Sequence, residues 1–223
     1  EPGENILTVQ AHNSTVISSW FAFHAELLAN IVRGPFISAT TSTGTKIAWS
    51  TLHPTTSVIE YGPTAALGQR IESEILTTNH VLRLIDLKPN TNYHYRVGGV
   101  AEGIPRFSKT TSFKTLKPSG PVRLMLLGDS GSGNLLQHKF AKVIRDNQPD
   151  AILHAGDIVY NFKSGPPGYY PDFRHFSVYK ELMKSVPFFT AIGNHELYYG
   201  DAAYLNAFHL PTNNLPTLGL KPP

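Results

Sequence analysis

The sequence predicts an all-β sandwich followed by the first half of an α/β domain with the order βαβαβ. Short β-prone runs separated by turn residues fill residues 36–115, which is typical of a sandwich. After the linker-like run from Lys117 to Pro121, longer apolar runs alternate with helical stripes, which is typical of a parallel sheet. We therefore expect a helical segment over 1–33, a sandwich over 34–118 and an α/β domain over 119–223.

The composition of the 223 residues excludes several classes of chemistry. Cysteine is absent, so disulfides and thiolate metal sites are excluded and any metal must be held by oxygen or imidazole. The net charge of +3 comes from scattered Lys and Arg, which gives no support to a nucleic acid or a membrane surface as partner. The most apolar stretch, Trp20 to Val32, contains His24 and Glu26, so no membrane-spanning segment is expected.

An amphipathic helix is predicted over residues 14–33. Ser14 can cap its start, and Gly34-Pro35 would end it. Its apolar residues recur at steps of three and four, namely Val16, Trp20, Phe23, Leu27 and Ile31. The expected role is a helix packed on its neighbours.

The next region carries the signals of short strands separated by turns such as Lys88-Pro89-Asn90. The segment from Leu87 to Tyr95 resembles the corner of fibronectin type III domains, in which a tyrosine at the start of a strand bonds back to the preceding loop. The resemblance implies that Tyr93 makes this bond and that Trp49 lies in the core. The strand candidates are Lys46–Ser50, Ser57–Tyr61, His80–Leu84, Tyr93–Val97 and Thr111–Lys114.

Three buried strands and two helices are predicted after the linker. The apolar run Val122–Leu127 is expected to be a strand covered on both faces, and Ala151–Ala155 and Val186–Ile192 are the next two strands. Asp172 would cap the second helix. The first helix is marked by the stripe Leu135, Leu136, Phe140, Val143 and Ile144.

A glycine-led polar turn follows each predicted strand. These turns are Gly128–Gly131, Gly156–Tyr160 and Gly193–Glu196. The carboxyl ends of parallel strands share one edge of the sheet, where open α/β sheets bind ligands. Three turns of this type on successive strands predict a site at that edge.

The oxygen donors of these turns point to two metal ions. Asp129 is a hard oxygen ligand, Asp157 has two oxygens that could bridge two ions, and Asn194 supplies a neutral amide oxygen. The phenol of Tyr160 ordinarily ionises near pH ~10, so its use as a ligand favours a strongly Lewis-acidic ion such as Fe³⁺. Two metals ~3.5–4 Å apart would activate water and stabilise a phosphoryl transition state.

Each residue also has a plainer interpretation. Alone, Asp129 or Asp157 would be a turn former or helix cap, and Tyr160 a half-buried packing residue. His195 could be a structural hydrogen-bonding residue, and Glu196 could cap a helix or form a salt bridge. Independent caps would not select this ordered set, which favours the metal interpretation.

The three turns look like the first three motifs of the purple acid phosphatases, within the calcineurin-like metallophosphoesterases. The resemblance implies that Asp129 and Tyr160 bind Fe³⁺ and that Asp157 bridges to a divalent Zn²⁺, Mn²⁺ or Fe²⁺ held by Asn194. It also implies that His195 faces the phosphate and leaving group as electrostatic stabiliser or proton donor.

The family's two later histidine motifs are not found after His195. Only His209 follows, and we expect no substitution by His138, His154 or His175. The chain is therefore expected to be an N-terminal portion that hydrolyses little by itself. Its partner would be the C-terminal half of the same protein, covalent or as a separate chain.

The resemblance implies an acid phosphatase that hydrolyses phosphate monoesters by attack of a metal-bound hydroxide. It also implies secretion, or a periplasmic location in a bacterium, and leaves a homodimer open. One alternative is a non-catalytic adhesion or binding protein with a degenerate hydrolase half. Another is a phosphodiesterase or nucleotidase of the same superfamily, which Tyr160 disfavours because those relatives usually lack the phenolate ligand.

Overall fold

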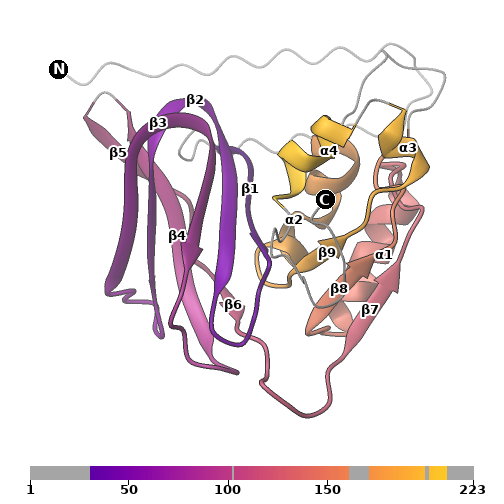
Figure 1. The fold of residues 1–223 in the computed structure, drawn as a ribbon, viewed down its shortest axis with the longest axis horizontal. Helices are drawn as coiled ribbons and strands as arrows, with labels where there is room; N and C mark the ends of the chain where they lie inside the picture. Colours follow the sequence, from indigo (N-terminus) through magenta and orange to yellow (C-terminus); the bar gives the residue numbers. More distant parts are fainter. Residues whose placement is uncertain (1–30, 102, 161–170, 199–200, 210–223) are drawn as a thin grey trace, which may run out of the picture.

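The computed structural model describes residues 31–101, 103–160, 171–198 and 201–209. Figure 1 shows a β-sandwich on one side and an α/β unit on the other. The predicted helix over 14–33 lies outside the described residues except at its last three positions. No helix of the described part is long and apolar enough to cross a membrane.

The sandwich is built around one long strand, β2. This strand pairs antiparallel with β1, β3 and β4, and β4 pairs with β5 and β6. The sequence predicted two strands here, but the chain stays extended because its pairing with β3 skips through bulges between Ser50 and Ser57, where Pro54 is exposed. The strands are β1 (Ile31–Ser38), β2 (Thr45–Gly62), β3 (Gln69–Leu84), β4 (Asn92–Ala101), β5 (Ile104–Phe107) and β6 (Thr111–Lys114).

The first strand corrects the predicted helix end. Residues 31–33 begin β1 rather than finish a helix. The pairing of β1 with β2 sets Phe36 opposite Ala48 and Ile37 opposite Ile47, and it buries Ile37 completely. Burial against a neighbouring strand therefore decides the conformation, and the helical spacing seen in the sequence does not extend into this segment.

Two predictions about the sandwich core are confirmed. Trp49 is 1% exposed and stacks on His80 at 4.8 Å between ring centroids. The backbone N–H of Lys88 donates to the Tyr93 hydroxyl at 3.0 Å, which is the expected bond between the tyrosine and its preceding loop.

The α/β unit has the predicted βαβαβ order. Strands β7, β8 and β9 form a parallel sheet in that order, so two crossovers carry the chain back to the same edge. A π-helical turn, η1, precedes the second helix. The elements are β7 (Leu124–Leu127), α1 (Leu135–Asp146), β8 (Ala151–His154), η1 (Asp172–Phe176), α2 (Ser177–Met183), β9 (Phe188–Thr190), α3 (Asn194–Leu197) and α4 (Asp201–Phe208).

Strand β7 is not covered on both faces by the described residues. Leu126 is 71% exposed, and Leu124 is also exposed. The first helix faces the core with Gln137, Ala141 and Ile144. Most of its predicted apolar stripe points away from that core, because Leu135, Leu136, Phe140 and Val143 are exposed. Among the described residues, the prediction that Val122–Leu127 is a strand covered on both faces is therefore wrong, because Leu124 and Leu126 of β7 are exposed.

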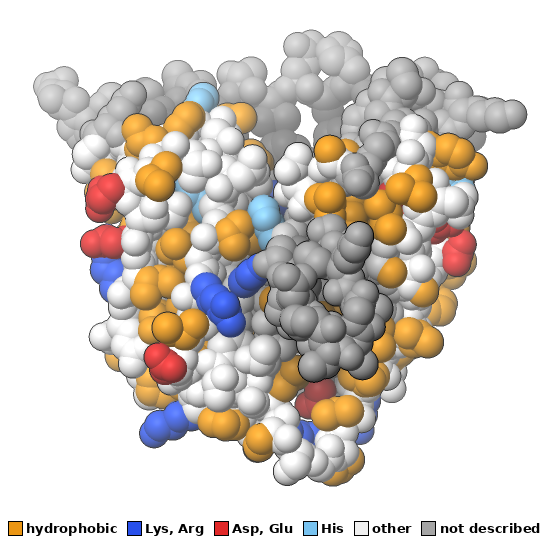
Figure 2. All heavy atoms as spheres, viewed as in Figure 1, with side chains coloured by type: hydrophobic (Ala, Val, Ile, Leu, Met, Phe, Trp, Pro, Cys, Tyr) orange, Lys and Arg blue, Asp and Glu red, His pale blue; other side chains and the backbone are white. Residues whose placement is uncertain are grey.

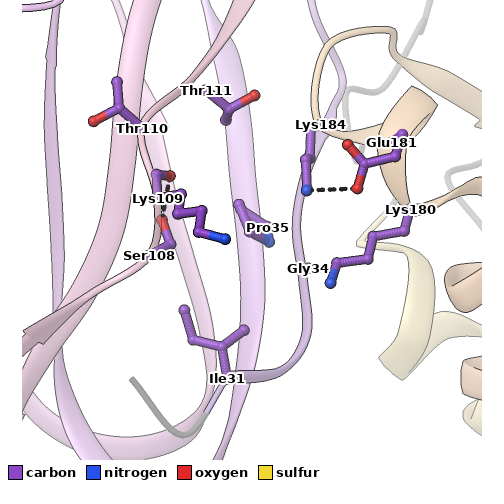
Figure 3. Close-up of a pocket in the computed structure, with 10 residues that line it drawn as sticks. All are labelled: Ile31, Gly34, Pro35, Ser108, Lys109, Thr110, Thr111, Lys180, Glu181 and Lys184. Atoms are coloured by element: carbon purple, nitrogen blue, oxygen red, sulfur yellow. Dashed lines mark hydrogen bonds and ion pairs between the residues drawn. The ribbon is translucent and has the colours of Figure 1, made fainter. Parts of the chain in front are cut away.

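The two domains touch where β1 and β4 of the sandwich meet η1 and the end of α2. The Phe36 and Phe176 rings lie 5.1 Å apart, and the Tyr95 hydroxyl donates to the Lys184 carbonyl at 2.8 Å. Lys and Arg side chains gather near this boundary in Figure 2. A pocket of about 400 Å³ lies beside this boundary, and Figure 3 shows it between Lys109 of the sandwich and the residues at the end of α2. There Lys184 forms an ion pair with Glu181 at 2.8 Å.

Candidate metal centre

The first two polar turns are joined by backbone hydrogen bonds. The N–H of Asp129 donates to the Gly156 carbonyl and that of Ser130 to the Asp157 carbonyl, both at 3.2 Å, and the N–H of Tyr160 donates to the Gly131 carbonyl at 2.9 Å. Asp129 and Asp157 both have φ of 52°, in the left-handed region that few side chains other than Asn and Asp adopt readily. The parallel pairing of β7 and β8 thus continues into matched turns.

Glycine is required where these turns pack together. A Cβ on Gly131 would lie 2.1 Å from the Ile158 carbonyl oxygen. A Cβ on Gly193 would lie 2.2 Å from both the backbone nitrogen and the Oδ1 atom of Asp157. The glycines in the motifs therefore allow the three turns to come within contact distance.

Three side-chain oxygens converge between the first two turns. The Tyr160 hydroxyl donates to Asp129 Oδ1 at 2.5 Å, and it lies 3.4 Å from Asp157 Oδ2. Burial and the hydrogen bond to Asp129 raise the pKa of Tyr160 above its ordinary value of 10. The carboxylates of Asp129 and Asp157 and the phenol of Tyr160 are hard oxygen donors that surround one proton. A strongly Lewis-acidic cation could take the place of that proton.

The third turn reaches the same place through its backbone. The His195 N–H donates to Asp157 Oδ1 at 3.1 Å, and the His195 ring lies 4.4 Å from the Tyr160 ring. Asn194 is the exposed first residue of α3, and its amide hydrogen-bonds no side chain among the described residues. The structure thus gathers Asp129, Asp157, Tyr160 and His195, with Asn194 on the adjoining turn.

Glu196 is a site residue whose role the sequence left open. It is 0% exposed, and its carboxylate accepts hydrogen bonds from the backbone N–H groups of Asp157, Ile158, Val159 and Gly193. The only signal in the sequence was its position three residues after Gly193, which is typical of a helix cap. The contacts with the distant Asp157 turn depend on the tertiary fold.

Of the other histidines considered as ligands, His154 bonds to the first two turns, whereas His138, His175 and His209 lie away from them. The Gly156 N–H donates to His154 Nδ1 at 3.3 Å, so Nε2 carries the proton and donates to Ser130 Oγ at 2.8 Å. Burial lowers the pKa of His154 to about 4, against the opposing charges of Asp129 and Asp157. His138 is exposed on α1, His175 is buried among aromatic rings, and His209 stacks on Phe36.

Within the described ranges, no group of three or more His, Asp or Glu side chains is arranged to hold a metal. The donors that are present are two carboxylates, a phenol and an amide. They are the oxygen donors of the ligand set that the resemblance implies, and these residues contribute no imidazole.

An apolar pocket of about 440 Å³ adjoins the Asp129 carboxylate. Its walls include Leu127 and Asp129 beside β7, Tyr160, and the α1 side chains Leu136 and Phe140. The site is therefore an edge of charged oxygens beside an apolar wall.

Comparison with known proteins agrees with this arrangement. Residues 122–221 match the calcineurin-like phosphoesterases, which is the class defined by the parallel sheet and its carboxylate turns. Residues 32–115 match the N-terminal domain of purple acid phosphatases. The chain therefore combines a purple acid phosphatase N-terminal domain with a calcineurin-like phosphoesterase domain.

The similar curated proteins are much longer than the chain. Acid phosphatase type 7 of Homo sapiens is 30% identical over 186 residues, which are 75% of the chain and 41% of that protein. Probable inactive purple acid phosphatase 27 of Arabidopsis thaliana is 29% identical over 144 residues, which are 55% of the chain and 22% of that protein. The solved structure of PhoD superimposes with a TM-score of 0.58 at 13% identity over 80% of the chain and 41% of PhoD, which supports the fold alone.

Proposed function

We propose that the protein is an acid phosphatase that hydrolyses phosphate monoesters at a pair of metal ions, Fe³⁺ and a divalent ion. The observation that carries the proposal is the convergence of Tyr160 with Asp129 and Asp157. The matches to the purple acid phosphatase N-terminal domain and to the calcineurin-like phosphoesterases support a phosphoesterase, and the phenol among the proposed ligands favours the ferric assignment.

The residues that would hold the metals follow from their donor atoms. Asp129 and Tyr160 would hold Fe³⁺, Asp157 would contact both ions, and Asn194 would hold Zn²⁺, Mn²⁺ or Fe²⁺. When bound, the pair supplies Lewis acidity to the phosphoryl oxygens and lowers the pKa of the attacking water. Burial and the hydrogen bond to Asp129 raise the pKa of Tyr160, so its use as a ligand would favour a strongly Lewis-acidic cation.

His195 would stabilise the phosphate or protonate the leaving group. Its backbone is held by Asp157 and its ring packs edge-on against Tyr160, so the imidazole is oriented beside the carboxylate cluster. A histidine held this way can donate a proton to a departing alkoxide without moving its backbone.

The rest of the protein would complete the metal centre. The chain spans 41% of the human relative, so we propose that a C-terminal portion, covalent or separate, supplies the imidazole ligands. The 223 residues alone should then hydrolyse little. Secretion, or a periplasmic location in a bacterium, and a homodimer are proposed from the family likeness.

The test is metal analysis and visible spectroscopy of the longest form that the coding sequence specifies. A phenolate bound to Fe³⁺ gives a visible charge-transfer band, and we expect Tyr160→Phe to abolish it. Tyr61→Phe is the matched control, because Tyr61 lies in β2 of the sandwich and its variant should keep the band. A band that persists in the Tyr160→Phe protein would contradict the ferric assignment.

Substrate assays separate the alternatives. Faster hydrolysis of p-nitrophenyl phosphate than of bis-p-nitrophenyl phosphate is expected, and the reverse order would favour a phosphodiesterase. A protein with neither iron nor a second metal, and with no hydrolysis, would favour a binding or adhesion module.

A further inference from the structure

Glu196 is a fully buried carboxylate at the junction of two polar turns. We propose that it is a positioning residue for the metal centre, one that fixes Asp157 relative to Asn194 and His195. This inference rests on the proposed function. Because Glu196 is 0% exposed, it does not contact substrate, and its effect must pass through the groups that it holds.

The carboxylate binds one turn through three successive N–H groups. Its Oε2 atom accepts from Asp157 at 3.0 Å, and its Oε1 atom accepts from Ile158 at 2.9 Å and Val159 at 3.1 Å. The left-handed conformation of Asp157, with φ of 52°, occurs at the start of this run. Three converging N–H donors form a favourable site for an anion, so the carboxylate stabilises a turn that begins with a left-handed residue.

The same carboxylate also holds the third turn. Its Oε2 atom accepts from the Gly193 N–H at 2.9 Å, and the neighbouring His195 N–H donates to Asp157 Oδ1 at 3.1 Å. Since Gly193 leaves no room for a Cβ beside Asp157, the two turns touch directly. The distance from Asp157 to the Asn194–His195 pair is therefore set by Glu196.

A helix cap explains only part of this arrangement. Glu196 is the third residue of the short helix α3, and its bond to Gly193 is the ordinary bond of a cap. Its other three bonds cross to residues 37 to 39 positions earlier in the sequence. A residue that served only to start α3 would not make them.

The experiment compares Glu196→Gln with wild type in the longest form of the protein. Glutamine keeps the shape but has one acceptor oxygen, and its NH₂ group would face N–H donors. Loss of a partner that orients metal ligands typically weakens metal binding by about 10- to 100-fold. We expect that loss in equilibrium dialysis, together with faster amide hydrogen exchange at Ile158 and Val159 in the metal-free protein.

A matched control separates positioning from general destabilisation. Ile144→Val changes a buried residue of α1 in the same domain and removes one methyl group. It should lower the melting temperature but leave metal affinity and the exchange of Ile158 and Val159 unchanged. Measurements are made well below both melting temperatures.

The outcomes separate this inference from the function on which it rests. If wild type binds no metal, the proposed function fails and the positioning role with it. If wild type and the folded Gln variant bind metal equally, the positioning role alone is overturned. Should the Gln variant not fold, Glu196→Asp is used, since its shorter carboxylate should give an intermediate loss, and wild-type affinity in that variant would overturn the proposal.

Discussion

The sandwich (β1 to β6) and the α/β unit (β7 to α4), which is the hydrolase half of this chain, differ in where their large apolar side chains lie. In the sandwich, Trp49, Tyr95 and Phe113 are all buried within one cluster of the domain's own strands. In the hydrolase half, Leu126 and Phe140 remain exposed on the outer strand and the first helix. Ile75 and Leu76 of the sandwich are exposed as well, so the two regions differ in where the exposed side chains lie. In the hydrolase half they lie on a strand that was predicted to be covered and on the predicted apolar stripe of a helix, and the described residues do not cover them.

The two regions also differ in how they use buried polar groups. His80 of the sandwich bonds Thr51 and Ser57 through its two ring nitrogens, and both bonds are buried in the core. In the hydrolase half, the carboxylate oxygens of Glu196 accept hydrogen bonds from the backbone of the turn that begins at Asp157. Buried polarity supports packing in one domain and the shape of a site in the other.

The largest expected effect comes from the sandwich core. Trp49→Ala should lower the free energy of unfolding by about 3–5 kcal/mol, because a large buried ring leaves a cavity. Chemical denaturation followed by circular dichroism measures the change. Leu52→Ala is the control, since Leu52 is exposed on the same strand and should change stability by less than about 0.5 kcal/mol. Equal effects of the two substitutions would contradict a complete sandwich core.

Acidification should give the next largest effect. Burial lowers the pKa of His80 from 6.5 to about 4, so the unfolded chain takes up this proton first. The contribution of neutral His80 to the free energy of unfolding is fully present above pH 6.5 and is lost as the pH falls toward 4. Over that range the free energy of unfolding should fall by up to about 1.4 kcal/mol per pH unit for this histidine.

The measurement is the free energy of unfolding of wild type and His80→Gln at several pH values between 7 and 4. The variant should show a shallower pH dependence. His53→Gln serves as control, because His53 is exposed on β2 and its replacement should leave the slope unchanged. A slope that survives in the His80→Gln protein would assign the acid sensitivity to other groups.

The smallest effect is expected at the open face of the hydrolase half. Leu126→Ala should change the stability of the 223-residue chain by less than about 0.5 kcal/mol, because this side chain is already exposed. In the longest form of the protein, burial of the same leucine by a C-terminal portion would raise the loss to about 2–5 kcal/mol. Denaturation of both forms makes the comparison, and equal losses would show that this portion does not cover β7.

Local patterns predicted much of the fold and the candidate site residues. Apolar runs that alternate with helical stripes indicated the parallel sheet, and the glycine-led turns singled out Asp129, Asp157 and Tyr160 as candidates, because strand ends and tight turns have local signatures. The union of two predicted strands into β2 was missed, since bulges near Pro54 let the chain stay extended. The start of β1 was missed because pairing with β2 outweighed a helical spacing.

The sequence by itself determined which donors this protein has and the order in which they follow its strands. Oxygen chemistry, the absence of cysteine and the three turns are properties of residue type and spacing. Only the tertiary structure decided that Tyr160 meets Asp129 and that Glu196 binds a turn almost forty residues away. Such contacts depend on the register of a parallel sheet and on glycines that permit close approach, and neither is a property of any single segment.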